Sequence, residues 1–208
     1  MIRCVELIVL MEFAEMPRPK SFDPDTVLAK AMGVFWEKGY DAASISDLTA
    51  AMGINRFSLY DTFGDKHELY LKALDAYSMN VVGSMVQRIN SIESIDDIES
   101  FFGAIIEYQH SGQSSPCCMM HRAAISLAAV DEEARSRVED ARSRFHGAFH
   151  DAVLRIKAAG EIRAGLDLNH AAWLLMITQS GLGSYHGTPV PRDEAAGAVR
   201  ALLSQFKA

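Results

Sequence analysis

Apolar residues recur at helical spacing along the first third of the chain, in short runs with clear starts and stops. The first run follows Asp23-Pro24, where a side-chain cap precedes a proline at the first helical position, and it stops at Gly39. Glycine there supplies the left-handed conformation that ends a helix. A later run starts with a cap at Asp65 and keeps apolar residues on one face as far as Val81. The pattern therefore predicts a first helix and a longer fourth helix that continues into the rest of the chain.

Two short helices between these runs have the spacing of a helix-turn-helix. Ser44 opens a capping-box pattern, and Gly53 closes the helix that follows. Asn55 then caps another helix, predicted over 56–63, after a turn of about three residues. Helices this short are not stable alone, so they are expected as parts of a larger packed unit.

The third helix, predicted over 56–63, has an unusual set of side chains on its solvent-exposed face. If Leu59 and Phe63 are its buried pair, its other positions mix hydrogen-bonding and flat apolar groups that suit base edges and thymine methyls. These positions are Arg56, Phe57, Ser58, Tyr60 and Thr62. The alternative is a plain helical hairpin inside a larger α-domain, because short capped helices are common. The pattern favours DNA binding over that alternative.

Five more helices are predicted in the remaining two thirds of the chain. Their ranges are 95–110, 117–130, 132–159, 168–187 and 192–206. The six prolines fall mostly where segments join, which leaves long uninterrupted stretches and disfavours a many-stranded fold. We therefore expect an all-α protein of about nine helices.

The start of the chain and the cysteines bear on where the protein works. A methionine followed by basic residues at 16–20 looks like a second start, so residues 1–15 are interpreted as an upstream extension. The apolar stretch over 5–13 contains acids and lacks a cleavage site, so it is not interpreted as a signal peptide or a membrane span. Three cysteines, of which Cys117 and Cys118 are adjacent, cannot build a disulfide framework. The expectation is a cytoplasmic protein with no membrane partner.

The acidic balance is an objection to nucleic-acid binding. The net charge is −7, and residues 16–72 hold seven basic and eight acidic side chains, whereas a DNA-binding protein is expected to show a basic face. Four of those acids fall at helix starts, where the helix dipole partly offsets them and backbone N–H groups can bind phosphates. They are Asp23, Asp47, Asp65 and Glu68. Such a domain should make few phosphate contacts per subunit and rely on dimerisation for affinity.

Three stretches carry a resemblance to a known family. Residues 39–48 read GYDAASISDL, and AMGI at 51–54 and SLYDTFGDK at 58–66 follow in order. With them the chain resembles the TetR family of bacterial regulators over nearly its whole length. The resemblance implies a homodimeric, ligand-responsive repressor that binds operator double-stranded DNA. Its helix-turn-helix domain would span 16–68, and a helical effector-binding and dimerisation domain would span 69–208.

The resemblance also assigns expected DNA contacts. In the family, positions matching Tyr60 and Lys66 contact backbone phosphates, while other positions of the motif face bases or nearby phosphates. Carried over by position, the expected contacts are Arg18, Lys20, Ser44, Ser46, Arg56, Phe57, Ser58, Tyr60, Thr62 and Lys66. The chain departs from the family where Phe57 replaces a small residue or proline and where Ala43 replaces a hydroxyl residue. The operator sequence therefore stays open.

The last two predicted helices are expected to form the dimer interface. Helices 168–187 and 192–206 are rich in small and apolar residues, which let helices approach closely. In the family these two helices of each subunit pair into a four-helix bundle across a two-fold axis. The alternative is that the same residues fill the core of one subunit.

A second cluster is expected to form an effector pocket. Aromatic residues and methionines with a few polar groups suit an apolar small molecule. The candidates are Phe101, Phe102, Ile105, Tyr108, Gln109, Cys117, Cys118, Met119, Met120, Trp173, Met176 and Gln179. For any one of these residues, an ordinary place in the core is the more common outcome.

Two groups of residues invite chemistry beyond binding. Cys117 and Cys118 follow a proline at a predicted helix start, where the dipole can lower the pKa of a thiol and favour attack by electrophiles or oxidants. The alternative is a pair of small buried side chains. His146 and His150 are four residues apart, and Cys118 and His121 three, which a zinc site could use.

The His146–His150 and Cys118–His121 spacings do not recur in a larger group of cysteines and histidines, so no metal site is expected. No cofactor is expected either. An enzyme would need a nucleophile elbow, a phosphate-binding glycine loop or paired carboxylates, and none of these motifs is present. The protein is therefore not expected to be an enzyme. A helical scaffold without DNA binding would leave the outer face of the third helix without a purpose.

Overall fold

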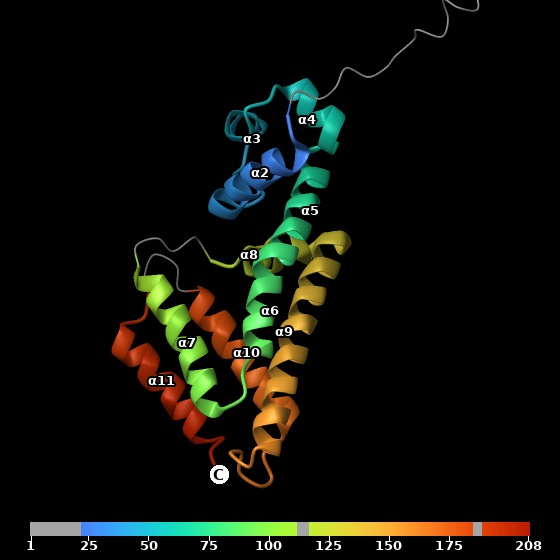
Figure 1. The fold of residues 1–208 in the computed structure, drawn as a ribbon. Helices are drawn as coiled ribbons and strands as arrows, with labels where there is room; N and C mark the ends of the chain where they lie inside the picture. Colours follow the sequence, from blue (N-terminus) through green and yellow to red (C-terminus); the bar gives the residue numbers. More distant parts are fainter. Residues whose placement is uncertain (1–21, 112–116, 185–188) are drawn as a thin grey trace, which may run out of the picture.

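The computed structural model describes residues 22–111, 117–184 and 189–208. These residues are helical almost throughout, as predicted (Figure 1). The α-helices are α2 (Pro24–Lys38), α3 (Ile45–Met52), α4 (Arg56–Phe63), α5 (Lys66–Tyr77), α6 (Gly83–Asn90), α7 (Ile95–His110), α8 (Met119–Ile125), α9 (Glu132–Ala158), α10 (Leu168–Ser184) and α11 (Arg192–Ser204). Because α5 and α6 are continuous, the described residues form nine helices, and the all-α expectation is confirmed.

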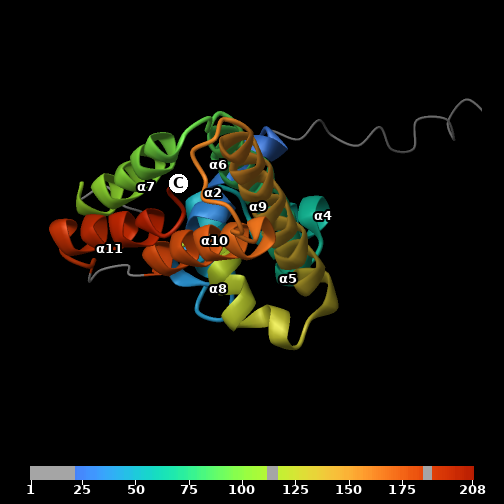
Figure 2. The ribbon, with the colours of Figure 1, turned by 90° about the horizontal axis from the view of Figure 1, so that it is seen from below.

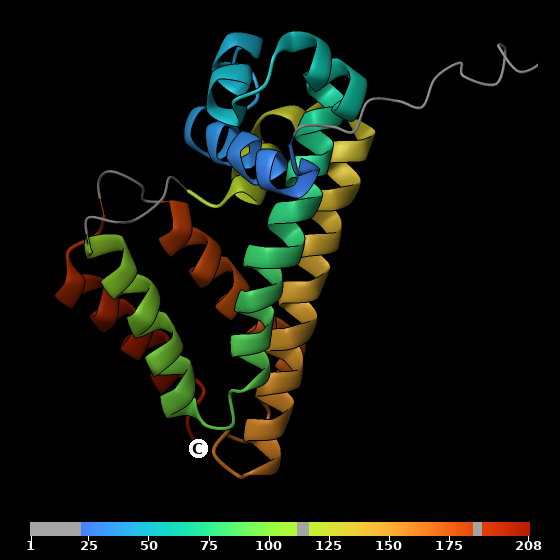
Figure 3. The ribbon, with the colours of Figure 1, turned by 45° about the horizontal axis from the view of Figure 1, so that its top comes forward.

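The predicted caps set the starts of the first helices. Asp23 accepts a hydrogen bond from the backbone N–H of Thr26, and Ser44 and Asp47 form a capping box with both bonds present. Asn55 caps α4 in the same way. Each cap satisfies N–H groups that a helix start leaves without an intrahelical partner. Local sequence therefore delimits α2, α3 and α4, which form a small head at one end of the molecule (Figure 3).

A long helical rod connects the head to the rest of the protein. It consists of α5, a π-helical turn at Ser78–Val82, and α6. The guanidinium of Arg144 on α9 donates to the hydroxyl of Ser78 at 2.9 Å, so the π-helical turn is fastened to α9. In Figure 3 the green rod runs alongside the yellow-to-orange α9, and α6 and α9 pack together. The predicted fourth helix, which continues into the rest of the chain, is confirmed.

The C-terminal part is built around α9. Helices α6 and α10 pack on α9, while α11 packs on α7 (Figures 1 and 2). Phe149 of α9 stacks on Phe102 of α7 at a ring-centroid distance of 6.4 Å and meets the edge of Phe101 at 5.8 Å. These rings join the two layers in one apolar core. None of the described helices is both long and apolar enough to cross a lipid bilayer.

Two predicted helix boundaries are wrong. The segment over 117–130 is not one helix, because α8 ends at Ile125. The next residue, Ser126, has φ of −118° and ψ of −94°, which break the helical path before a 3-10 turn at Leu127–Ala129. The last helix ends at Ser204 rather than at 206, because the chain turns there to pair with the loop after α9. The prediction for 95–110 is confirmed. Residues 185–187 of the predicted 168–187 helix lie outside the described residues.

Candidate nucleic-acid interface and effector cavity

The turn between α3 and α4 is built by a glycine and a cap. Gly53 takes the left-handed conformation with φ of 71°, and its N–H bonds to the carbonyl of Thr49. Asn55 then caps α4 through the N–H of Ser58. Glycine adopts the left-handed conformation more easily than other residues, so the sequence itself determines this short turn. It sets the orientation of α4, which carries the predicted reading surface.

Helix α4 has one buried and one exposed face. Leu59 and Phe63 are 0% and 4% exposed, which confirms them as the buried pair. On the opposite side, Phe57 is 79% exposed and Tyr60 is 46% exposed. Arg56 is exposed beside them. An exposed aromatic ring leaves apolar surface in contact with water until a partner covers it.

Two residues expected on the outer surface of α4 lie partly inside instead. Ser58 and Thr62 are both half-buried, and the Thr62 hydroxyl oxygen is fully buried. Among the described residues, this hydroxyl has no hydrogen-bond partner. The reason is helical geometry, because Thr62 lies three residues after Leu59 and directly before Phe63 and so turns toward the core.

The expected contacts in and before α3 are exposed, but Ser44 has a structural role. Its hydroxyl accepts from the N–H of Asp47 at 3.0 Å and donates to the Asp47 carboxylate at 2.7 Å. Lys38 donates to the same carboxylate at 2.7 Å, and together with Ser44 it holds the pKa of Asp47 well below its usual value. Ser46 is exposed on α3.

Lys66 lies at the start of α5, where it contacts the loop before α3. Its ammonium nitrogen is 4.6 Å from the ring centroid of Tyr40 and donates to the carbonyl of Asp41 at 3.5 Å. These contacts hold a cation at the edge of the head. The expected contacts Arg18 and Lys20 lie outside the described residues.

A cavity of about 180 Å³ lies between α8, α9 and α10. Four of the twelve expected pocket residues line it, namely Cys118, Met120, Met176 and Gln179. Sequence reasoning missed the other eight, which are His121, Ala124, Val138, Ala141, Arg142, Phe145, Ser180 and Gly183. The four from α9 are spaced i, i+3, i+4 and i+7, a helical stripe that was visible in the sequence.

The remaining expected pocket residues do not line this cavity. Phe101, Phe102 and Met119 are buried in the core, whereas Tyr108 is 50% exposed. Ile105 is partly buried against the core. Gln109 donates to the carbonyl of Leu182, and Trp173 packs on the ring of His146 at 4.3 Å. The twelve expected residues do not all meet at this cavity, because helical neighbours on α7 and α8 point in different directions.

The two cysteines have different surroundings. The Cys118 thiol lines the cavity and contacts the hydroxyl of Tyr77, whose pKa is raised mainly by burial and also by this thiol. Cys117 lies toward the head, and its backbone carbonyl accepts a hydrogen bond of 3.0 Å from the indole N–H of Trp36 in α2. Both thiols are free of disulfides.

Helix α8 also contacts the head through Arg122. Its guanidinium donates to the carbonyl of Glu37 at 3.0 Å, and its side chain lies against Gly39 at the end of α2. Together with Trp36, this contact fastens the last turn of α2 to the segment that borders the cavity. The cavity and the head are therefore joined through a few defined contacts.

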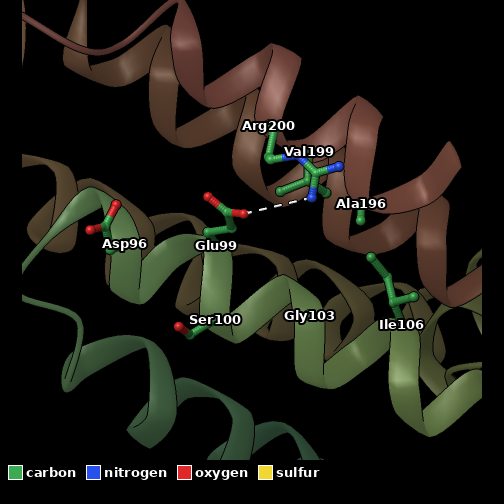
Figure 4. Close-up of a pocket in the computed structure, with 8 residues that line it drawn as sticks. All are labelled: Asp96, Glu99, Ser100, Gly103, Ile106, Ala196, Val199 and Arg200. Carbon is green, nitrogen blue, oxygen red and sulfur yellow. Dashed lines mark ion pairs between the residues drawn. The ribbon is translucent and has the colours of Figure 1, made fainter. Parts of the chain in front are cut away.

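A larger hollow of about 550 Å³ lies between α7 and α11 (Figure 4). Its sides carry Glu99 and Arg200, which face each other as an ion pair at 3.8 Å. Asp96, Ser100 and small residues complete most of the lining. Because the lining carries the acids Asp96 and Glu99 and its one arginine is already paired, this groove offers less to an apolar ligand. The smaller cavity beside α8 is the better candidate for an effector.

Comparison with known proteins identifies the family. A family model described as bacterial regulatory proteins, tetR family, matches residues 27–73. The HTH-type transcriptional regulator YezE of Bacillus subtilis is 32% identical over 168 residues, which cover 80% of this chain and 86% of the relative. The HTH-type transcriptional repressor ComR of Escherichia coli is 28% identical over 79% of this chain and 80% of its own length.

The chain belongs to the tetR family of bacterial regulatory proteins. It is accordingly a helix-turn-helix transcriptional regulator that binds DNA, and not an enzyme. Among solved structures, a cysteine-substituted variant of the TetR family transcriptional regulator CifR, complexed with 26-bp double-strand operator DNA, is similar with a TM-score of 0.78 and 27% identity. The match covers 91% of this chain and 100% of that one.

The two departures from the tetR-family pattern have different structural settings. Ala43 is fully buried, so this position contributes packing under α3. Phe57 is more exposed than Tyr60, the other aromatic residue on the outer face of α4. As for metals, no group of three or more His, Cys, Asp or Glu residues in 22–111, 117–184 and 189–208 could hold an ion.

Proposed function

We propose that the protein is a homodimeric, cytoplasmic repressor that binds operator double-stranded DNA through α4 and is released when an effector occupies the cavity beside α8. The exposed face of α4 carries this proposal, because Arg56, Phe57 and Tyr60 project from a head whose other large apolar residues are mostly packed. The helix-turn-helix domain is assigned to 16–68 and the effector-binding and dimerisation domain to 69–208.

Different residues of the head are given different roles on DNA. Arg56 and Phe57 are placed against base edges and thymine methyls, because one offers a fork of donors and the other a flat apolar ring. Tyr60 and Lys66 are placed against phosphates. The exposed side chains of Ser44 and Ser46 flank this surface.

Local pairing of an acidic side chain is compatible with DNA binding by a head that is near neutral overall. The Asp47 carboxylate is paired with Lys38, so its charge is locally compensated. In addition, the caps at α3 and α4 leave helix N-termini close to the reading surface, where backbone N–H groups attract phosphates. The acidic net charge is thus compatible with few, well-placed phosphate contacts.

The dimer is assigned to the outward faces of α10 and α11, which lie along one side of the C-terminal part in Figure 2. On α10, Leu174 and Ile177 are 44% and 59% exposed, and Gly181 is exposed one turn further on. On α11, Ala198 and Ala201 are exposed. Apolar and small side chains on two neighbouring helices suit close packing against a second copy.

Operator binding tests the proposal directly. DNA from the promoter of this gene and its neighbours is titrated with protein, on the native sequence and on a scrambled duplex. We expect Tyr60→Ala and Lys66→Ala to weaken binding to both duplexes about equally. Arg56→Ala should cost about 1–3 kcal/mol on the native duplex alone, if Arg56 reads guanine.

Lys157→Ala is the matched control, because Lys157 is an exposed cation in the last turn of α9, far from the head. It should leave both titrations unchanged. An equal loss on both duplexes for Arg56→Ala would remove Arg56 from base recognition. Wild-type protein that binds no promoter fragment would overturn the assignment of α4.

A reactive effector is the second candidate mode of release. The Cys118 thiol lines the cavity and is free, so an electrophile that enters could modify it. Added bulk would strain a packed region next to α2. If Cys117→Ser and Cys118→Ser, singly and together, leave release by electrophiles unchanged, a reversible ligand is the remaining explanation.

A further inference from the structure

We propose that the cavity between α8, α9 and α10 binds a small carboxylate with an apolar body, held by Arg142. This inference rests on the proposed function, because the carboxylate would be the effector of the repressor. It starts from three properties of the cavity, namely its size, the direction in which it opens, and the charges of the residues that line it.

The size of the cavity limits the ligand. A volume of about 180 Å³ corresponds to about six water molecules at roughly 30 Å³ each. Sites for drug-sized ligands span roughly 300–1,000 Å³. The cavity therefore fits a short-chain or single-ring compound and excludes the large aromatic molecules that bigger pockets accept.

The exposure of the lining residues distinguishes the floor of the cavity from its mouth. Met120, Phe145 and Met176 are 5%, 8% and 8% exposed, so the floor is apolar. The side chain of Arg142 is 52% exposed, which places it at the opening. A ligand that fits has its apolar part directed inward and its polar group at the rim.

The charges select the sign of that polar group. Among the described residues that line the cavity, Arg142 is a permanent cation and none carries a carboxylate. Glu139 pairs with Arg142 only at 3.8 Å, and both side chains are more than half exposed, so this pair contributes little. Because a guanidinium binds a carboxylate through two parallel hydrogen bonds, an organic acid can displace Glu139.

Other polar residues complete the rim. Gln179 and Ser180 from α10 add an amide and a hydroxyl, and His121 from α8 contacts the hydroxyl of Ser184 at 3.1 Å. These groups come from two helices, α8 and α10, that both border the cavity. A carboxylate bound to Arg142 would therefore connect α9 to α8, the helix that contacts the head through Arg122.

Calorimetric titration with matched ligands tests the proposal. The probes are hexanoate, hexanol and hexylamine, and benzoate, benzyl alcohol and benzylamine, each added to the full-length protein. We expect the two acids to bind and the alcohols and amines to bind at least about tenfold more weakly. Arg142→Gln should lower acid affinity about tenfold or more, whereas Arg142→Lys should retain part of it.

Two controls keep the test specific. Lys157→Gln removes an exposed cation from the same helix and should change nothing, and Ala124→Leu narrows the cavity from its exposed edge and should weaken the acids without removing the charge. Acids that bind no better than the amines, or that bind Arg142→Gln as well as wild type, would overturn the inference. Operator binding is measured separately without ligand, so that a failure here leaves the repressor assignment standing.

Discussion

Single residues in the head serve either the fold or the reading surface, and their burial separates the two. Ser44 and Asp47 complete a capping box, whereas Phe57 has most of its surface in solvent. The partners of Asp47 in this capping box lie within the protein, so its role does not depend on DNA. Phe57 has no such role within the described structure, so its substitution tests function alone.

The Asp47 contacts predict an acid-sensitive head. The pKa of Asp47 is lower in the folded protein than its ordinary value of 3.8. The ionised carboxylate therefore stabilises the folded state fully above pH 3.8, and this stabilisation is lost as the pH falls from 3.8 toward the lower pKa of the folded protein. Asp47→Ala should therefore lower the melting temperature at pH 7, and the difference from wild type should shrink below about pH 4. Thermal unfolding from pH 7 to pH 2 measures this.

The control for this series is Asp151→Ala, which removes an exposed acid from the middle of α9. Its difference from wild type should be small at every pH. A melting-temperature difference for Asp47→Ala that stays constant down to pH 2 would show that the carboxylate charge is not what stabilises α3.

Phe57 predicts a separation of binding from stability. Burying most of its ring against DNA would contribute about 1–2 kcal/mol, so Phe57→Ala should weaken operator binding about 5- to 30-fold. The melting temperature should stay unchanged, because the ring is 79% exposed in the free protein. Operator titration and thermal unfolding of one preparation give both values, and an unaltered affinity would exclude Phe57 from the interface.

At the scale of elements, α8 is the connection between cavity and head. It is short, it borders the cavity on one side, and the chain around it contacts the end of α2 through Trp36 and Arg122. The rod of α5 and α6 makes a second connection, held to α9 by the two hydrogen bonds between Arg137 and Asp75. We therefore expect a ligand beside α8 to act on the head through these contacts with α2.

Trp36→Phe tests that connection. The substitution keeps a ring against Tyr77 but removes the hydrogen bond to the Cys117 carbonyl, which is worth about 0.5–1.5 kcal/mol. We expect operator affinity without effector to change little and the effect of the acid panel on operator binding to fall about 2- to 10-fold. Titrations with and without hexanoate or benzoate measure both quantities.

Hydrogen exchange supplies a readout that needs no effector. Amides in the last turn of α2 should exchange faster in Trp36→Phe than in wild type, because this turn loses a contact with the segment before α8. Unchanged exchange together with an unchanged effector response would show that α2 is not coupled through this bond.

At the scale of the molecule, the proposed dimer would hold two reading heads at a fixed separation. Gly181 lies on the exposed face of α10, and a Cβ added there meets no atom of the described residues within 4 Å. Gly181→Glu should therefore leave the subunit folded, with a better helix former in place of glycine, while placing a charge in the interface.

We expect Gly181→Glu to sediment as a species of 22.9 kDa and to lose tight operator binding, because each head alone covers only one half-site. Gly33→Glu is the matched control, since Gly33 is exposed on α2 and equally free of neighbours. That control should remain a dimer. A dimer of unchanged stability in Gly181→Glu would place the interface elsewhere.

The sequence by itself was enough to predict the helices of the head and to indicate the family. Ser44, Gly53 and Asn55 act on their immediate neighbours, so capping and turn chemistry could be predicted without any tertiary contact. The same local patterns carried the resemblance to the tetR family. The expected buried pair of α4 followed from helical spacing alone.

Only the tertiary structure decided which residues form the cavity and which side of α4 Thr62 faces. A cavity collects side chains from α8, α9 and α10, and helical periodicity predicts a buried face without saying which helix it meets. For that reason Phe101 and Phe102 of α7 were expected in a pocket but lie in the core, while Arg142 was not expected there at all. Local interactions fix helices, whereas long-range packing of their faces fixes the site.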